Sequence, residues 1–283
     1  LFRDARIHTP VSDGGGCVSW ERGALLVRDG LIERVGREDD VVQGLDPSQI
    51  DQEIGLGGRC VVPGFVDPHT HMCFSELREK EFATRLSGVP YLEILRSGGG
   101  ILSSVRSVRS ACDETILGRT LKNIHISLSH GTTTVEIKSG YGLDTASGIR
   151  LLRLIERVGR QTPVTVVPTF MGAHAVPSEF TDDPEGYVDL LVKEMIPAVS
   201  AECTPPFCDV FCEESVFSVP QTRRILDTAR EHGMKLKVHA DEVTDTGGAA
   251  LAAAMGAVSA EHLLAAREEN LAKMAPAGVM AVL

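Results

Sequence analysis

Long apolar runs and basic residues are both scarce in this sequence. No uninterrupted apolar stretch could cross a bilayer, and the opening LFRDARIHTP lacks the order of charged, apolar and small residues that marks a signal peptide. Lysine and arginine number 28 against 39 acidic residues, which makes the net charge −11. Proteins that bind nucleic acid concentrate basic residues, because these displace counterions from the phosphates. We therefore expect a cytoplasmic protein that binds neither membranes nor nucleic acid.

The seven cysteines have no spacing typical of a disulfide framework. Several lie in apolar runs, such as Cys208 and Cys212 in FCDVFC, so we expect reduced, buried thiols. A C-x-x-x-C pair could in principle hold a metal ion, but thiolate zinc sites usually need two such pairs. We therefore expect the catalytic or metal-binding residues to lie elsewhere in the chain.

What is present is a regular alternation of strand-like and helix-like segments. Residues 1–60 show short alternating runs with glycine and aspartate at the turns, which predicts a small β domain, part of a composite β-sandwich. Beyond them, seven apolar runs read as strands: 61–71, 132–140, 164–172, 207–212, 236–242, 257–262 and 278–283. Helical segments are expected between them at 114–130, 146–160, 185–200, 220–233, 244–255 and 266–276.

Alternation of this kind requires parallel strands with helices packed outside them. Seven such units are one short of the eight that close a barrel. The predicted fold is therefore α/β, with residues 61–283 forming a (β/α)8 TIM-like barrel of the metal-dependent hydrolase type that lacks its eighth strand. The long first crossover contains SGVPYLEILRSGGG, residues 87–100, which we interpret as an extra helix and a glycine turn over the barrel mouth.

The motif Asp67-Pro68-His69-Thr70-His71 ends the first predicted barrel strand. Residues two apart in a strand point to the same side, so both imidazoles should face one cavity. Two imidazole nitrogens at the carboxyl end of a barrel strand are typical of half of a catalytic zinc or iron site. The alternative explanation is a pair of surface histidines.

Three more histidines fall at later strand ends, where active-site residues of barrels lie: His174, His239 and His262. Each taken alone is most simply a hydrogen-bonded core or rim histidine, but their convergence indicates a catalytic centre. Glu242 follows His239 by three residues, far enough to lie over a metal ion and act as a general base. Its alternative role is that of a carboxylate at a helix start.

Three stretches, PGFVDPHTH, EIKSGYGL and HADE, resemble the imidazolonepropionase family of the amidohydrolase superfamily. Further matching stretches are REKEF, YLEILRSGGGI, TFMGAH and DVFCEE, so the resemblance covers nearly the whole chain. It implies a hydrolase that opens the cyclic amide of 4-imidazolone-5-propionate to N-formimidoyl-L-glutamate in histidine degradation. It also implies a homodimer.

The resemblance assigns a role to each site residue. His69, His71 and His239 would bind one divalent metal ion, zinc or iron. Glu242 would take a proton from the water that the metal activates, and His262 would polarise the carbonyl or stabilise the oxyanion. The substrate would be held by Arg78, Tyr141 and His174, with the Arg78 guanidinium suited to the carboxylate tail.

Lys138 bears on the number of metal ions, because related binuclear amidohydrolases bridge two metals with a carboxylated lysine on the fourth barrel strand. The fourth strand here, FCDVFC, has no lysine, and Lys138 ends the second strand. We therefore expect a single metal ion. Lys138 would be a cation that either stabilises the structure or contacts one of the residues that bind the metal.

The superfamily also takes an aspartate from its eighth strand as a metal ligand, and the sequence stops at Leu283 before such a strand. We expect a piece of a longer enzyme rather than an inactive barrel. Two competing hypotheses remain open. One is another cyclic amide or amidine hydrolase, of the deaminase or hydantoinase type, from which Arg78, Tyr141 and His174 should distinguish this chain. The other is a non-catalytic scaffold that keeps a structural metal.

Overall fold

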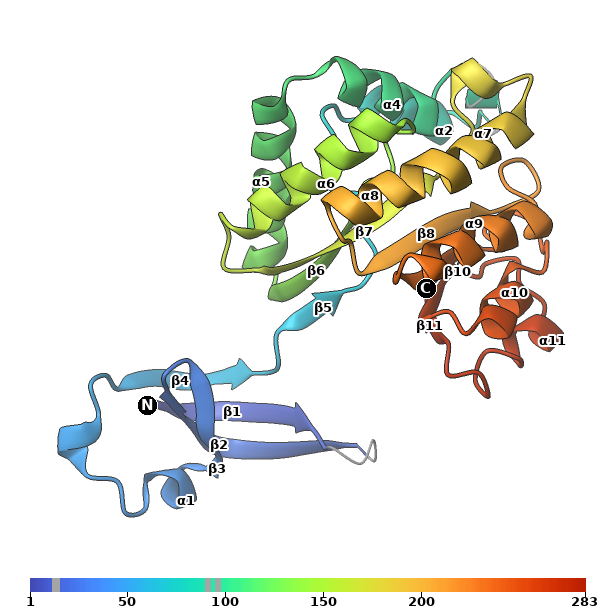
Figure 1. The fold of residues 1–283 in the computed structure, drawn as a ribbon. Helices are drawn as coiled ribbons and strands as arrows, with labels where there is room; N and C mark the ends of the chain where they lie inside the picture. Colours follow the sequence, from blue (N-terminus) through green and yellow to red (C-terminus); the bar gives the residue numbers. More distant parts are fainter. Residues whose placement is uncertain (12–15, 90–92, 95–97) are drawn as a thin grey trace. The chain divides into compact units, whose positions relative to one another are not determined.

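The computed structural model describes residues 1–11, 16–89, 93–94 and 98–283. Within these residues the chain divides into two compact units, Leu1–Gly64 and Phe65–Leu283. Each is described by itself (Figure 1). The extra helix expected in SGVPYLEILRSGGG falls partly on residues 90–92 and 95–97, which lie outside the described residues.

The first unit is built on a four-stranded sheet in the order β3-β2-β1-β4. Its central pair β1–β2 and the pair β2–β3 are antiparallel, whereas β1 and β4 are parallel. A small apolar cluster of Ala24, Leu26 and Val41 packs on it. The bounds are β1 Phe2–Pro10, β2 Cys17–Arg28, β3 Leu31–Arg37, β4 Ile54–Val61, α1 Glu38–Val42 and a 3-10 turn at Pro47–Gln49.

The second unit contains a sheet of seven strands that are adjacent in chain order, β5 through β11, and all parallel. Each matches one of the seven runs predicted as strands, although β7 and β9 each extend one residue beyond the run, so the barrel-type α/β fold is confirmed. In the part of the chain that the structure describes, the sheet is open between β5 and β11. The bounds are β5 Phe65–Asp67, β6 Thr132–Lys138, β7 Thr165–Ala173, β8 Phe207–Cys212, β9 Lys235–Ala240, β10 Ser259–His262 and β11 Met280–Val282.

Helices connect these strands, as the alternation predicts. Helix α6 packs against β7 and also contacts α8 (Figure 1). Helix α6 buries Leu151, Leu152, Ile155 and Val158, which share one face because they recur every three or four residues. The bounds are α2 Glu79–Leu86, α4 Ile101–Ser110, α5 Asp113–Ser129, α6 Thr145–Gly159, α7 Pro184–Leu190, α8 Ile196–Glu202, α9 Val219–Glu231, α10 Gly248–Met255 and α11 Glu268–Leu271. A 3-10 turn at Ser178–Phe180 precedes α7, and a π-helical turn at Leu191–Met195 joins α7 to α8.

Two helix boundaries differ from the prediction by more than two residues. Helix α10 begins at Gly248 instead of residue 244, because Gly247 has a left-handed φ of +88° and the Asp241 carboxylate caps the N–H groups of Gly248 and Ala249. Helix α11 is short because the N–H groups of Lys273 and Met274 bond three residues back instead of four. Of the helices in the described residues, none is long and apolar enough to cross a bilayer.

The sheet core explains why the strands appear in the sequence as apolar runs. Ile137, Phe170, Val210, Val238 and Ala260 are all buried, one from each of five consecutive strands. Parallel strands are covered on both faces, so alternation of polar and apolar residues is lost. The polar residues that do occur near the strand ends are therefore candidates for functional residues.

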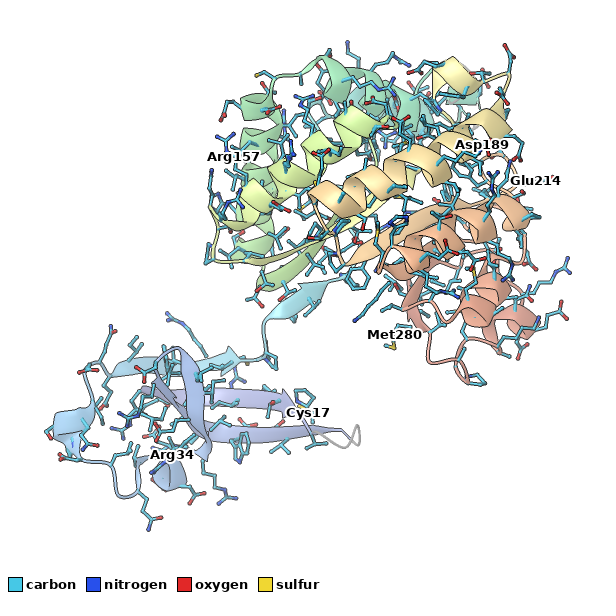
Figure 2. All side chains as sticks on the ribbon, viewed as in Figure 1. Cys17, Arg34, Arg157, Asp189, Glu214 and Met280 are labelled. Carbon is cyan, nitrogen blue, oxygen red and sulfur yellow. The ribbon has the colours of Figure 1, made fainter. Side chains whose placement is uncertain are left out.

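The cysteines only partly match the expectation of buried thiols. All seven are free, and Cys73, Cys203, Cys208 and Cys212 are buried. The prediction is wrong for Cys17, Cys60 and Cys112, which are exposed. Cys17 and Cys60 lie on strands of the small sheet, whose pattern alternates between buried and exposed residues; Figure 2 labels Cys17. Cys112 precedes α5.

Candidate active site

The H-T-H motif lies just beyond β5, not within it. The strand ends at Asp67, because Pro68 has no N–H to continue the ladder. Thr70 keeps the segment attached to β6: its hydroxyl donates to the carbonyl of Glu136 at 2.6 Å, and its carbonyl accepts the N–H of Lys138 at 3.1 Å. The rings of His69 and His71 consequently lie near each other, with centroids 5.3 Å apart.

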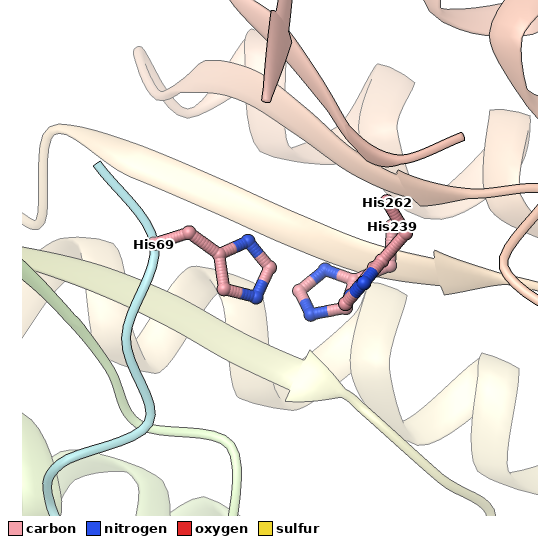
Figure 3. Close-up of side chains that lie close together, drawn as sticks. All are labelled: His69, His239 and His262. Atoms are coloured by element: carbon pink, nitrogen blue, oxygen red, sulfur yellow. The ribbon is translucent and has the colours of Figure 1, made fainter. Parts of the chain in front are cut away.

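Three other imidazoles reach the same place from later strand ends. His239 lies in β9, His262 is the last residue of β10, and His174 follows β7 directly. One ring nitrogen from each of His69, His239 and His262 lies within 4.8 Å of the others, and Figure 3 shows these rings turned toward one another. The Nε2 atom of His71 is 3.2 Å from Nε2 of His239. The fold thus brings together all five histidines predicted for the site.

Buried carboxylates orient two of these rings. His69 Nδ1 donates to Glu261 Oε2 at 2.9 Å, and His239 Nδ1 donates to Asp209 Oδ1 at 3.0 Å. Because a carboxylate only accepts, each Nδ1 carries the proton and each Nε2 presents a lone pair. Histidine ligands of metals are commonly oriented in this way by a carboxylate.

Each of these carboxylates is paired with a buried lysine. Lys138 Nζ donates to Asp209 Oδ2 at 2.6 Å and to Glu136 Oε1 at 2.7 Å. Lys237 Nζ lies 2.9 Å from Glu261 Oε1 and donates to the Pro68 carbonyl at 3.2 Å. Burial opposes ionisation of Lys138, but Asp209 and Glu136 outweigh it and raise the lysine pKa. The contact with Asp209 agrees with the interpretation of Lys138 as a cation that supports a metal ligand.

Four charged residues of the site were not predicted from the sequence: Asp209, Glu261, Glu136 and Lys237. A signal was available, because each is a charged residue within a strand that is otherwise buried, and charged residues are rarely buried without a partner. The sequence does not say which of them pair. That depends on which strands are neighbours, which only the fold decides.

The donor set fits a divalent cation. Burial lowers the pKa of His71 well below its ordinary value and that of His239 to about 3, so both imidazoles are neutral, the form that binds metals. Close to them lie the buried carboxylates of Glu136, Asp209 and Glu261, which are paired with Lys138 and Lys237. The buried Nδ1 of His71 has no hydrogen-bond partner among the residues that the structure describes. The lone pairs of the neutral imidazole nitrogens, close to these carboxylates, attract a cation.

Glu242 and His262 form the rim of the cluster. Glu242 Oε2 lies 3.8 Å from His262 Nε2, and their side chains are 35% and 28% exposed, so both can reach a ligand. Burial lowers the pKa of His262, although Glu242 opposes the effect. An acid–base carboxylate and a hydrogen-bonding imidazole next to a cation site are suited to hydrolysis.

A cavity of about 380 Å³ adjoins the cluster and is lined by His71, Arg78 and Tyr141 among others. Arg78 forms an ion pair with Glu81 at 3.7 Å. The Tyr141 ring is 5.3 Å from that of His174, which stacks on His71 at 4.6 Å. Burial lowers the pKa of His174 to about 4, and its Nδ1 donates to the Gly140 carbonyl at 2.7 Å. The residues predicted to bind substrate thus lie at or beside one cavity.

Known proteins resemble this chain over its whole length. A family model described as "Amidohydrolase family" matches residues 60–280. Imidazolonepropionase from Syntrophobacter fumaroxidans is 55% identical over 100% of this chain and 69% of its own length. Imidazolonepropionase from Desulfotalea psychrophila is 49% identical over 100% of this chain and 70% of its own. The chain therefore spans about two thirds of the length of these relatives.

Among solved structures, 5-methylcytosine deaminase from Klebsiella pneumoniae superposes with a TM-score of 0.69. It is 16% identical, and the match covers 99% of this chain and 64% of that one. At this identity the likeness concerns the fold alone. The sequence relatives are far closer, and with the matched family model they lead to one conclusion: the chain belongs to the amidohydrolase family and, within it, to the imidazolonepropionases.

Proposed function

We propose that the protein hydrolyses the ring amide of 4-imidazolone-5-propionate to N-formimidoyl-L-glutamate, a step of histidine breakdown. The observation that carries the proposal is the convergence of His69, His71, His239 and His262 beside Glu242, in a chain 55% identical to a protein named imidazolonepropionase. Family membership supports the substrate. The cavity next to the histidines, about 380 Å³, offers room for a small molecule.

His69, His71 and His239 would hold one divalent ion, zinc or iron. When bound, such an ion supplies a Lewis acid that activates water and polarises a carbonyl. His262 is a second candidate ligand, because its ring nitrogen lies within 4.8 Å of those of His69 and His239. Metal analysis separates the two assignments: His71→Ala should lower the metal content, whereas His262→Ala should keep it and lower kcat.

Glu242 would move the proton in the reaction. It accepts a proton from the attacking water, the water oxygen bonds to the ring carbonyl carbon, and the carbon–nitrogen bond breaks. Glu242 then returns the proton to the leaving ring nitrogen. His262, 3.8 Å from Glu242, would donate a hydrogen bond to the carbonyl oxygen as negative charge develops on it.

Arg78 would bind the propionate carboxylate. Its guanidinium lines the cavity and is paired with Glu81 only at 3.7 Å, so a substrate carboxylate can form closer, bidentate hydrogen bonds. Tyr141 and His174, whose rings lie 5.3 Å apart, would contact the ring of the substrate. A substrate without a carboxylate tail would leave Arg78 with only the 3.7 Å ion pair to Glu81, which argues against a nucleobase.

The test is hydrolysis of 4-imidazolone-5-propionate by the full-length, metal-loaded protein, with and without a chelator. Glu242→Gln should lower kcat by about 10²- to 10⁴-fold, because general acid–base catalysis is worth that much. Glu214→Gln is the matched control, because Glu214 is exposed nearby and should keep full activity. Turnover of a nucleobase or hydantoin in place of imidazolonepropionate would contradict the proposal.

Family membership also leads us to propose a cytoplasmic homodimer. Sedimentation equilibrium of the purified protein tests the assembly. A monomer at micromolar concentration would contradict it.

A further inference from the structure

Two buried carboxylates accept backbone N–H groups close to Glu242. One belongs to Asp241, the residue before Glu242, and the other to Glu213, the residue after β8. We propose that Asp241 and Glu213 are positioning residues that fix the Glu242 carboxylate over the reacting centre. This inference rests on the proposed function, because it takes Glu242 to be the proton carrier. Neither residue touches the predicted substrate cavity, so each acts through the backbone of the Glu242 segment.

The Asp241 side chain accepts hydrogen bonds from the backbone of the segment that follows Glu242. Its Oδ1 accepts the N–H groups of Thr246, Gly247 and Gly248 at 2.9, 3.1 and 2.9 Å, and its Oδ2 accepts that of Ala249 at 2.9 Å. The Asp241 residue is 0% exposed and has a φ of +51°, a left-handed conformation that is costly for aspartate. These bonds hold that conformation, which directs the next residue, Glu242, away from the strand.

Glu213 holds the same segment from the end of β8. Its Oε2 accepts the N–H groups of Val243 and Thr244 at 2.9 and 3.3 Å, directly after Glu242. Glu213 is only 3% exposed and its Oε1 accepts the N–H of Glu214 at 3.1 Å. Two buried carboxylates thus take up backbone donors on the C-terminal side of Glu242, while Asp241 itself precedes it.

The close approach of α10 makes this arrangement compact. A Cβ atom on Gly248 would lie 2.9 Å from Cβ of Ala240, so only glycine lets the helix start reach Asp241. The negative charge of Asp241 also lies at the N-terminus of α10, where unpaired N–H groups favour an anion.

The same segment connects to His262. The Asp241 carbonyl accepts the N–H of Ala265 at 2.8 Å, and the Ala240 carbonyl accepts that of Leu263 at 3.1 Å. His262 and Leu263 have φ values of +70° and +59°, so the turn after β10 is also held in a left-handed conformation. Asp241 therefore helps set the 3.8 Å separation between Glu242 and His262.

Asp241→Asn and Glu213→Gln test the proposal in the full-length, metal-loaded protein. Each keeps the side-chain shape but turns one acceptor oxygen into a donor that faces backbone N–H groups. We expect kcat to fall about 10- to 100-fold, since a small misplacement of a catalytic group costs that much, with KM and metal content unchanged. Asp245→Asn is the matched control, because Asp245 accepts from Gly247 in the same loop but bonds no residue adjacent to Glu242.

A double-mutant cycle separates positioning from general destabilisation. If Asp241 acts through Glu242, adding Asp241→Asn to Glu242→Gln should lower kcat no further. Full additivity, an unchanged kcat in the single variants, or an equal loss in Asp245→Asn would overturn the proposal. Amide hydrogen exchange of residues 243–249 is a readout that needs no turnover: exchange should speed up in Asp241→Asn and Glu213→Gln. If the wild-type protein does not hydrolyse imidazolonepropionate, the proposed function fails, while unchanged exchange contradicts the positioning role separately.

Discussion

Four of the five clustered histidines form two halves that are held by different means. His69 and His239 each donate Nδ1–H to a buried carboxylate, and each carboxylate is paired with a buried lysine. Within the described part of the chain, no carboxylate accepts from His71 or His174: His174 donates to the Gly140 carbonyl, and His71 Nδ1 has no partner. The first half is oriented by charge, and the second by backbone and ring packing.

The difference indicates where the cluster is rigid before any ligand arrives. A Lys–carboxylate–His chain fixes both the tautomer and the ring angle, so the Nε2 lone pairs of His69 and His239 already point at the shared space. His71 depends on stacking against His174 for its angle. We expect removal of one member of the charge-held half to cause a large loss of stability. A change in the packing-held half should have a smaller effect.

The largest effect is expected from Asp209→Ala. It leaves His239 without its acceptor and Lys138 buried with only Glu136, so the free energy of unfolding should fall by about 3–5 kcal/mol. Urea denaturation of the metal-free protein measures this. Glu156→Ala is the control, because Glu156 lies on α6 with only a 4.0 Å ion pair at the surface. A loss below about 1 kcal/mol would show that the charges do not hold this half.

A smaller effect is expected from acidification of the metal-free protein. Burial lowers the pKa of His174 from 6.5 to about 4, so between these pH values the unfolded chain binds a proton that the folded chain lacks. The stabilising contribution is complete above pH 6.5 and is lost as the pH falls toward 4, by about 3 kcal/mol. Denaturation midpoints from pH 7 to 4.5 measure the slope, to which the buried His71 and His239 also contribute, and His174→Gln should make that slope less steep. An unchanged slope in that variant would exclude His174 as the source.

The smallest effect is expected from Gly140→Ala, which disturbs the packing-held half. A Cβ at this position would lie 2.5 Å from His174 Nδ1, so the imidazole must move. We expect KM to rise several-fold, since His174 is proposed to bind substrate, while the metal content stays at its wild-type value. Gly118→Ala on α5 is the control, because a Cβ there meets nothing within 4 Å. Loss of metal from Gly140→Ala would mean that the two halves are coupled more tightly than their contacts suggest.

Parts of the site could be predicted residue by residue. His69, His71, His239 and His262 stand at or next to strand ends, and the carboxyl ends of parallel strands meet at one edge, so their convergence follows from the alternation of strands and helices. The placement of the H-T-H motif inside a strand is wrong, because the ladder stops at Pro68. The predicted start of α10 is wrong because the left-handed Gly247 interrupts the helix and Asp241, seven residues before Gly248, caps the first turn.

By itself, the sequence determined the seven strands, their parallel order and the identities of the histidines and of Glu242, because burial on both faces and strand-end position leave local patterns. The tertiary structure alone decided the pairing of His69 with Glu261 and of His239 with Asp209, which are 192 and 30 residues apart. It also decided that Glu213 would reach the segment after Glu242. Such partners are set by which strands lie side by side, and a buried charge shows only that it needs a partner, not which one it has.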